Sequence, residues 1–157
     1  MAGDQDLLAV LQVLATDHPE REGPTAASEL EQRTWAQMMH DGGLMVYLAE
    51  VAGSVIGTAT MMVMPNVTYE CRPTAFIEAV VVAPPFRRRG VATAIIRRAL
   101  GDAASAGCNK VQLLSQKRHA NDGAHRLYTA IGFEPEAEGF RLYLGEVPSA
   151  VQAVRAG

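Results

Sequence analysis

The amino-acid sequence predicts a mixed α/β fold, in which helices cover both faces of a central twisted sheet. Segments with helical spacing of apolar residues alternate with runs of β-branched residues, in the order helix, helix, strands, helix, strand, helix, strand. The chain has 157 residues, of which 48% are apolar and 20% are charged, and this suits a single globular domain. We expect residues 1–144 to form this domain and residues 145–157 to form a C-terminal tail.

The first half of the chain contains two amphipathic segments followed by two apolar runs. Leucines at positions 7, 8, 11 and 14 recur at helical spacing, and Gly42 and Gly43 end the second amphipathic segment. Ala52 and Gly53 separate the two apolar runs, a pattern typical of a hairpin. The expected elements are a helix over 6–17, a loop over 18–25, a helix over 27–41, and strands over 44–50 and 54–64.

The second half of the chain alternates strands and helices. A valine-rich run that ends at Val82 is interpreted as the central strand, and Gly107 and Gly132 are the expected ends of the two later helices. The expected elements are a strand over 75–82, a helix over 91–106, a strand over 110–115, a helix over 121–131, and a final strand over 140–144.

A turn rich in arginine and glycine connects the central strand to the next helix. Pro84 and Pro85 end the strand, arginines occupy positions 87–89, and Gly90 precedes the helix. The first amides of a helix have no partner within it and lie at the positive end of its dipole, so they attract phosphate. Gly90 lacks a Cβ, so ligand oxygens can approach the backbone closely. The turn therefore predicts a phosphate site, although it matches neither the dinucleotide fingerprint nor the P-loop.

A second pattern lies about thirty residues downstream. Ala124, Leu127, Tyr128 and Ile131 share one helical face, and Asn121 lies one turn earlier on the same side. This face therefore carries a phenol, which can act as a general acid.

Together the two patterns resemble the GNAT superfamily of acetyl-CoA-dependent N-acetyltransferases. Arg87-x-x-Gly90-x-Ala92 is similar to the pyrophosphate-binding motif [RQ]-x-x-G-x-[GA] of that family, and residues 121–133 are similar to its N-x-x-A-x-x-[LF]-Y-x-x-x-G-F segment. The resemblance extends over about residues 44–144 and implies the GNAT fold. That fold usually opens with a strand. Here helical spacing begins almost at once, so we expect the first strand to be short or missing.

The resemblance implies that acetyl-CoA is the co-substrate. Amides of the turn would hold its pyrophosphate, the asparagine would contact its pantetheine arm, and a backbone N–H at the end of the central strand would polarise the thioester carbonyl. The cofactor-binding residues that follow from the resemblance are Val80, Val81, Val82, Arg87, Arg88, Arg89, Gly90, Val91, Ala92, Thr93, Asn121, Ala124 and Tyr128.

Two residues are predicted to be catalytic. The resemblance implies that the Tyr128 hydroxyl lies near the sulfur and protonates the departing thiolate. Glu78 lies in an otherwise apolar strand, where a buried carboxylate is costly unless it has a partner or a task. We interpret Glu78 as the base that removes the ammonium proton, with a water relay as the alternative.

The implied function is transfer of an acetyl group to a primary amine of a small molecule, by direct attack in a ternary complex. Two alternatives stay open. One is acetylation of a protein lysine or N-terminus, and the other is a regulatory module that binds CoA without turnover. A homodimer is an expectation on family grounds alone.

Composition argues against several other classes of protein. The net charge of −3 and a single short arginine cluster give no extended basic surface for nucleic acid. The four histidines show no ligand spacing, so we expect no metal. Two cysteines make no disulfide framework, the N-terminus lacks the basic region of a signal peptide, and no apolar run is long enough to span a bilayer. We therefore expect a cytoplasmic protein.

Overall fold

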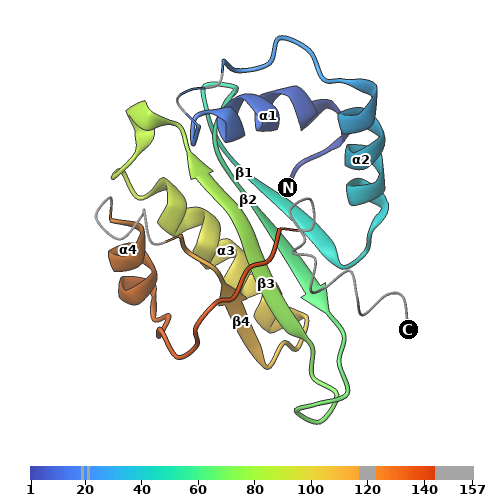
Figure 1. Cartoon of the computed structure of the whole chain (residues 1–157), viewed down its shortest axis with the longest axis vertical. Helices are drawn as coiled ribbons and strands as arrows, with labels where there is room; N and C mark the ends of the chain where they lie inside the picture. Colours follow the sequence, from blue (N-terminus) through green and yellow to red (C-terminus); the bar gives the residue numbers. More distant parts are fainter. Residues whose placement is uncertain (19, 21, 117–122, 144–157) are drawn as a thin grey trace.

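A mixed sheet forms the centre of the molecule (Figure 1). The computed structural model describes residues 1–18, 20, 22–116 and 123–143. Within these residues the sheet has four strands in the order β1-β2-β3-β4, the first three antiparallel and the last pair parallel. The strands are β1 (Leu44–Val51), β2 (Ser54–Met64), β3 (Thr74–Val82) and β4 (Lys110–Leu113). The predicted fold class is thereby confirmed.

Helices cover both faces of this sheet. Along β1, Val46 packs against α1 and α2 whereas Tyr47 packs against α3, because successive side chains of a strand point to opposite faces. Leu127 and Ile131 of α4 extend the second of these layers. The helices are α1 (Leu7–Ala15), α2 (Glu29–His40), α3 (Val91–Ser105) and α4 (Ala124–Ile131), with short 3₁₀ helices η1 (Asp4–Asp6) and η2 (Pro84–Phe86).

The larger core lies between the sheet and α3. Met61 on β2 and Ile96 on α3 are fully buried there. At the edge of this core the Tyr47 hydroxyl donates to Asp102 at 3.1 Å, and Asp102 also pairs with Arg98 at 3.0 Å. Burial, together with this bond to Asp102, raises the pKa of the Tyr47 phenol. The core fixes α3 against the sheet, and it thereby fixes the beginning of α3 relative to the end of β3.

The N-terminal residues do not form a strand of their own. The Ala2 amide donates to the Val46 carbonyl at 2.8 Å, beside the edge strand β1, and the chain then turns into η1. The Trp35 indole donates to the Gly3 carbonyl at 3.2 Å and holds this end of the chain against α2. The prediction that the first strand is short or missing is confirmed for the described residues.

Most predicted elements occur within a few residues of their expected bounds, and one does not. The final strand expected over 140–144 is wrong for residues 140–143, which have no strand pairing, and Leu144 lies outside the described residues. The local sequence favours a strand there, but it cannot supply a neighbouring strand to pair with. The segment instead crosses over the sheet (Figure 1). The last helix begins at Ala124 rather than residue 121, which is also outside the described residues.

Candidate active site

The turn rich in arginine and glycine lies between β3 and the beginning of α3. The 3₁₀ helix η2 follows β3, and Gly90 then serves as the N-cap of α3 with φ +83°. Only glycine adopts this left-handed conformation without a penalty from a Cβ. No protein atom lies within 4 Å of the position that a Cβ of Gly90 would take. The amides of the first helical turn thus lie beside a glycine that leaves open space in front of them.

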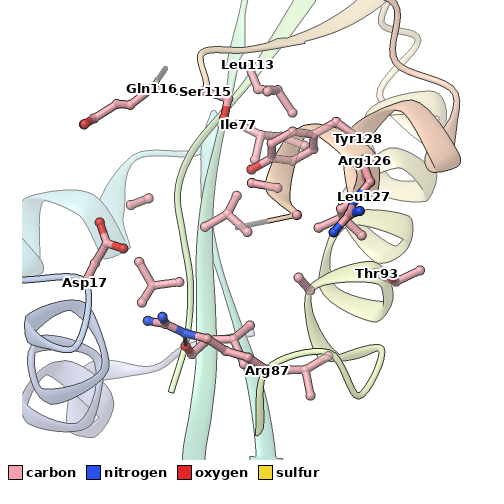
Figure 2. Close-up of a pocket in the computed structure, with 18 of the residues that line it drawn as sticks. Asp17, Ile77, Arg87, Thr93, Leu113, Ser115, Gln116, Arg126, Leu127 and Tyr128 are labelled. Carbon is pink, nitrogen blue, oxygen red and sulfur yellow. Dashed lines mark hydrogen bonds between the residues drawn. The ribbon is translucent and has the colours of Figure 1, made fainter. Parts of the chain in front are cut away.

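A cleft of about 540 Å³ extends from this turn to α4. Tyr128 lies at one end of it and Arg87 at the other, and Thr93 lies on α3 beside it (Figure 2). The predicted site residues that line the cleft are Glu78, residues 80–82, Arg87, Arg88, residues 90–93, Ala124 and Tyr128. Residues from two separate motifs therefore meet at one cavity.

The cleft exists because β3 and β4 separate. Their pairing ends at Ile77 and Leu113, and β3 continues without β4 beside it. Directly afterwards β3 has a bulge against β2, where Ala79 adopts φ +52°. A positive φ at a residue other than glycine costs about 1 kcal/mol or more, and such strain is commonly kept at functional sites. The β4-facing edge of β3 is thus left open to the cleft along residues 78–82.

The Arg87 side chain is bound to the protein itself. Its Nε donates to the Val82 carbonyl at 2.8 Å, and one of its terminal nitrogens donates to the Thr16 carbonyl at 3.3 Å. Arg87 therefore ties the end of α1 to the end of β3. These two bonds occupy donors of the Arg87 guanidinium with backbone carbonyls of the protein itself.

Of the other residues predicted to bind the cofactor, Arg89 is outside the cleft and Asn121 cannot be placed. The guanidinium carbon of Arg89 is 6.0 Å from the centroid of the Phe86 ring, and Arg89 does not line the cleft. Asn121 lies outside the described residues.

Tyr128 reaches the cleft from α4. Its ring is half-buried and meets Phe133 edge to face, with ring centroids 6.0 Å apart and planes at 75°. Figure 2 shows the Tyr128 hydroxyl pointing from α4 toward the strands. The α4 pattern predicted from the sequence thus places a phenol across the cleft from the open edge of β3.

Glu78 also lines the cleft, but its environment differs from the expected one. We expected a buried carboxylate, and this expectation is wrong because the Glu78 side chain is exposed. Ile77 points into the α3 core, so Glu78 points to the opposite face of the sheet. The apolar character of the sequence around Glu78 reflects its neighbours in the core and not its own surroundings.

Sequence reasoning missed several side chains of the cleft. Asp17 follows α1, Ser115 and Gln116 follow β4, Arg126 is on α4, and Arg141 lies in the segment that crosses the sheet. No local pattern marks these residues, because the tertiary arrangement alone brings them to one cavity. Among the described residues, no group of three or more histidine, cysteine or acidic side chains is arranged to hold a metal.

Comparisons with known proteins agree with this geometry. The family model for the acetyltransferase (GNAT) family matches residues 7–133. The chain therefore belongs to the GNAT family of acetyltransferases. A glucosamine 6-phosphate N-acetyltransferase of Trypanosoma brucei brucei is 29% identical over 143 residues, which cover 90% of this chain and 91% of the relative.

Solved structures share the fold over almost the whole chain. A structure from Agrobacterium tumefaciens str. C58, assigned to the acetyltransferases, is 32% identical with a TM-score of 0.82, covering 90% of this chain and 96% of that one. A Clostridium acetobutylicum structure determined with acetyl-CoA is 20% identical with a TM-score of 0.70, covering 93% and 95% of the two chains. Because only 20% of residues are identical, the similarity to the Clostridium acetobutylicum structure shows a shared fold alone.

Proposed function

We propose that the protein transfers an acetyl group from acetyl-CoA to the primary amine of a small molecule, by direct attack within a ternary complex. One observation carries this proposal. A single cleft joins the N-terminus of α3, the open edge of β3 and the Tyr128 ring. Acetyl-CoA is an elongated molecule that matches these features in order, with its diphosphate at α3, its pantetheine arm along β3 and its thioester sulfur at Tyr128.

The proposed cofactor site uses backbone groups along most of its length. The amides of residues 88–93 would hold the pyrophosphate, because they gather at the positive end of α3 beside Gly90. The open edge of β3 at residues 80–82 would offer N–H groups to the pantetheine amides and to the thioester carbonyl. We also place Asn121 and Ala124 on the pantetheine arm, and Arg89 at the outer rim of the diphosphate site.

The proposed chemistry needs one proton acceptor and one proton donor. The amine nitrogen attacks the thioester carbon, so an N–C bond forms and the C–S bond breaks. Glu78, or a water beside it, takes a proton from the amine, and the exposure of this carboxylate leaves it within reach of both. Tyr128 gives a proton to the leaving thiolate, and bulk water restores it.

Two measurements test this function. Acetyl-CoA at a hundred times its dissociation constant should stabilise the protein by about 2.7 kcal/mol, whereas ATP and NAD should leave its melting temperature unchanged. A screen of amines with acetyl-CoA, followed by release of free CoA thiol, should then reveal an acceptor. The absence of any stabilisation at saturating acetyl-CoA would refute the proposal. If a peptide is acetylated but no small amine is, the acceptor is a protein. If acetyl-CoA binds but no acceptor is acetylated, the protein is a regulatory module.

We further propose a setting for this activity. Residues 1–144 would form the catalytic domain, residues 145–157 a tail, and the chain would work as a homodimer in the cytoplasm. Cys71 and Cys108 are free thiols, as a reducing compartment would keep them. In the part of the chain that the structure describes, no helix combines the length and apolar character needed to cross a bilayer.

A further inference from the structure

Two opposite charges line the cleft on the face of the sheet that α3 does not cover. Glu78 is on β3 just before the bulge, and Arg141 is in the segment that crosses the sheet (Figure 1). Both side chains are exposed. Among the described residues these two make no ion pair within 4.0 Å. Both charges are thus presented to the same cleft without pairing with each other.

Local contacts hold Arg141 at this place. A Cβ on Gly139 would be 2.9 Å from a Leu114 methyl, so the chain passes close over the end of β4 on its way to Arg141. The Arg141 Nη1 donates to the Tyr143 hydroxyl at 3.3 Å, and its guanidinium carbon is 5.9 Å from the centroid of that ring. The bond to Tyr143, and to a lesser extent the charge of Glu78, raise the pKa of Arg141. The guanidinium is thus a permanent positive charge.

The other arginines that line the cleft lie elsewhere. Both donor groups of Arg87 described above bind backbone carbonyls. Arg88 lies in the turn before α3, at the end of the cleft that we assign to the diphosphate. Arg126 projects from α4, on the side of the cleft that carries Tyr128 (Figure 2). Arg141 is the remaining described arginine of the cleft, and its segment crosses the sheet on the face that carries Glu78.

We propose that the acceptor is a zwitterionic small molecule, an amine that also carries a carboxylate or phosphate, with its amine at Glu78 and its anion at Arg141. The inference rests on the proposed function and names the substrate class of the same site. A carboxylate such as Glu78 attracts an ammonium group and can take its proton. A guanidinium presents paired N–H donors whose geometry matches a carboxylate or phosphate. Arg141 is accordingly a specificity-determining residue.

Matched pairs of acceptors test this inference. Glucosamine is compared with glucosamine 6-phosphate, and butylamine with 4-aminobutanoate, so that each pair differs by one anionic group. Diaminobutane serves as the acceptor that carries a second positive charge in place of the anion. With acetyl-CoA saturating, we expect kcat/KM to be about 10- to 100-fold higher for the anionic member of at least one pair, as one charge-assisted hydrogen bond would give. The pair that responds distinguishes a phosphate from a carboxylate.

Variants of Arg141 show whether this residue is the source of the preference. Arg141→Gln should lower kcat/KM for the anionic member of the responding pair more than for its partner and so remove the preference, and Arg141→Lys should restore part of it. Arg33→Gln is the matched control, because Arg33 is an exposed arginine on α2 outside the cleft. The side chain of Arg141 is exposed, so its replacement is not expected to unfold the protein.

Three outcomes would overturn the inference. They are equal use of both members of each pair, a preference for diaminobutane, and an equal loss with both members in Arg141→Gln. In each of these cases CoA release would still support the proposed function. If no amine of the panel releases CoA, the inference also fails, and the thermal shift with acetyl-CoA decides separately whether the proposed function fails with it.

Discussion

Replacing Arg87 with glutamine should destabilise the protein through two lost hydrogen bonds. The bond to the Val82 carbonyl is short, at 2.8 Å, and partly buried, whereas the bond to Thr16 is longer, at 3.3 Å, and exposed. Hydrogen bonds from charged donors contribute about 1.5–3 kcal/mol when well formed, and exposed ones contribute less. We therefore expect the free energy of unfolding to fall by about 2 kcal/mol, which in a domain of this size lowers Tm by about 4–8 °C.

The same substitution should also affect cofactor binding, because Arg87 holds the turn that presents the amides of α3. Urea denaturation measures the loss of stability, and titration with acetyl-CoA measures the loss of affinity. Arg89→Gln is the matched control for stability, since the Arg89 guanidinium lies over the Phe86 ring at 6.0 Å and makes no bond of this kind to the end of α1. Stabilities of the two variants that agree within about 0.5 kcal/mol would refute this account of Arg87.

Three further predictions concern catalysis and the core. Tyr128→Phe should lower kcat about 10²-fold, as expected for loss of a general acid, while the dissociation constant of acetyl-CoA changes little; steady-state kinetics with unchanged kcat would remove Tyr128 from the mechanism. In the folded protein the pKa of Tyr47 is raised, mainly by burial and further by Asp102, whereas a tyrosine in the unfolded chain has a pKa of about 10. The free energy of unfolding should therefore fall as pH rises above about 10. In Tyr47→Phe the free energy of unfolding, measured by urea denaturation at a series of alkaline pH values, should decline less steeply with pH. Identical declines in the variant and the parent protein would contradict this. Met61→Ala should lower the free energy of unfolding by about 2–5 kcal/mol with an unchanged urea m value, because Met61 is 0% exposed; a loss below about 1 kcal/mol would show that this core is loosely packed.

The sequence was sufficient to predict those features of the structure that local chemistry determines. The turn around Gly90 was predictable because glycine, which lacks a Cβ, tolerates the positive φ that the chain adopts there. The face of α4 that carries Tyr128 followed from residue spacing alone. These two features supply residues at both ends of the cleft.

The features of the fold and the site that the sequence did not predict depend on contacts between distant segments. Ala79 has no side chain that would mark a bulge, yet its φ of +52° accompanies the opening of the sheet. Arg141 lay in a predicted strand, and only its path across the sheet brings it to the cleft. The burial of Glu78 was misjudged because its neighbours in sequence are apolar, whereas alternation along β3 turns its own side chain away from the core.

The central claim is that a diphosphate binds the amides at the beginning of α3. Calorimetric titration of acetyl-CoA into Gly90→Ala tests it most directly, because the new Cβ would lie in open space before those amides and would strain a φ of +83°. Gly101→Ala is the control, since Gly101 is within α3 and a Cβ there meets no atom within 4 Å. We predict that Gly90→Ala weakens acetyl-CoA binding about tenfold or more while Gly101→Ala does not. Equal affinities for the two variants would contradict it.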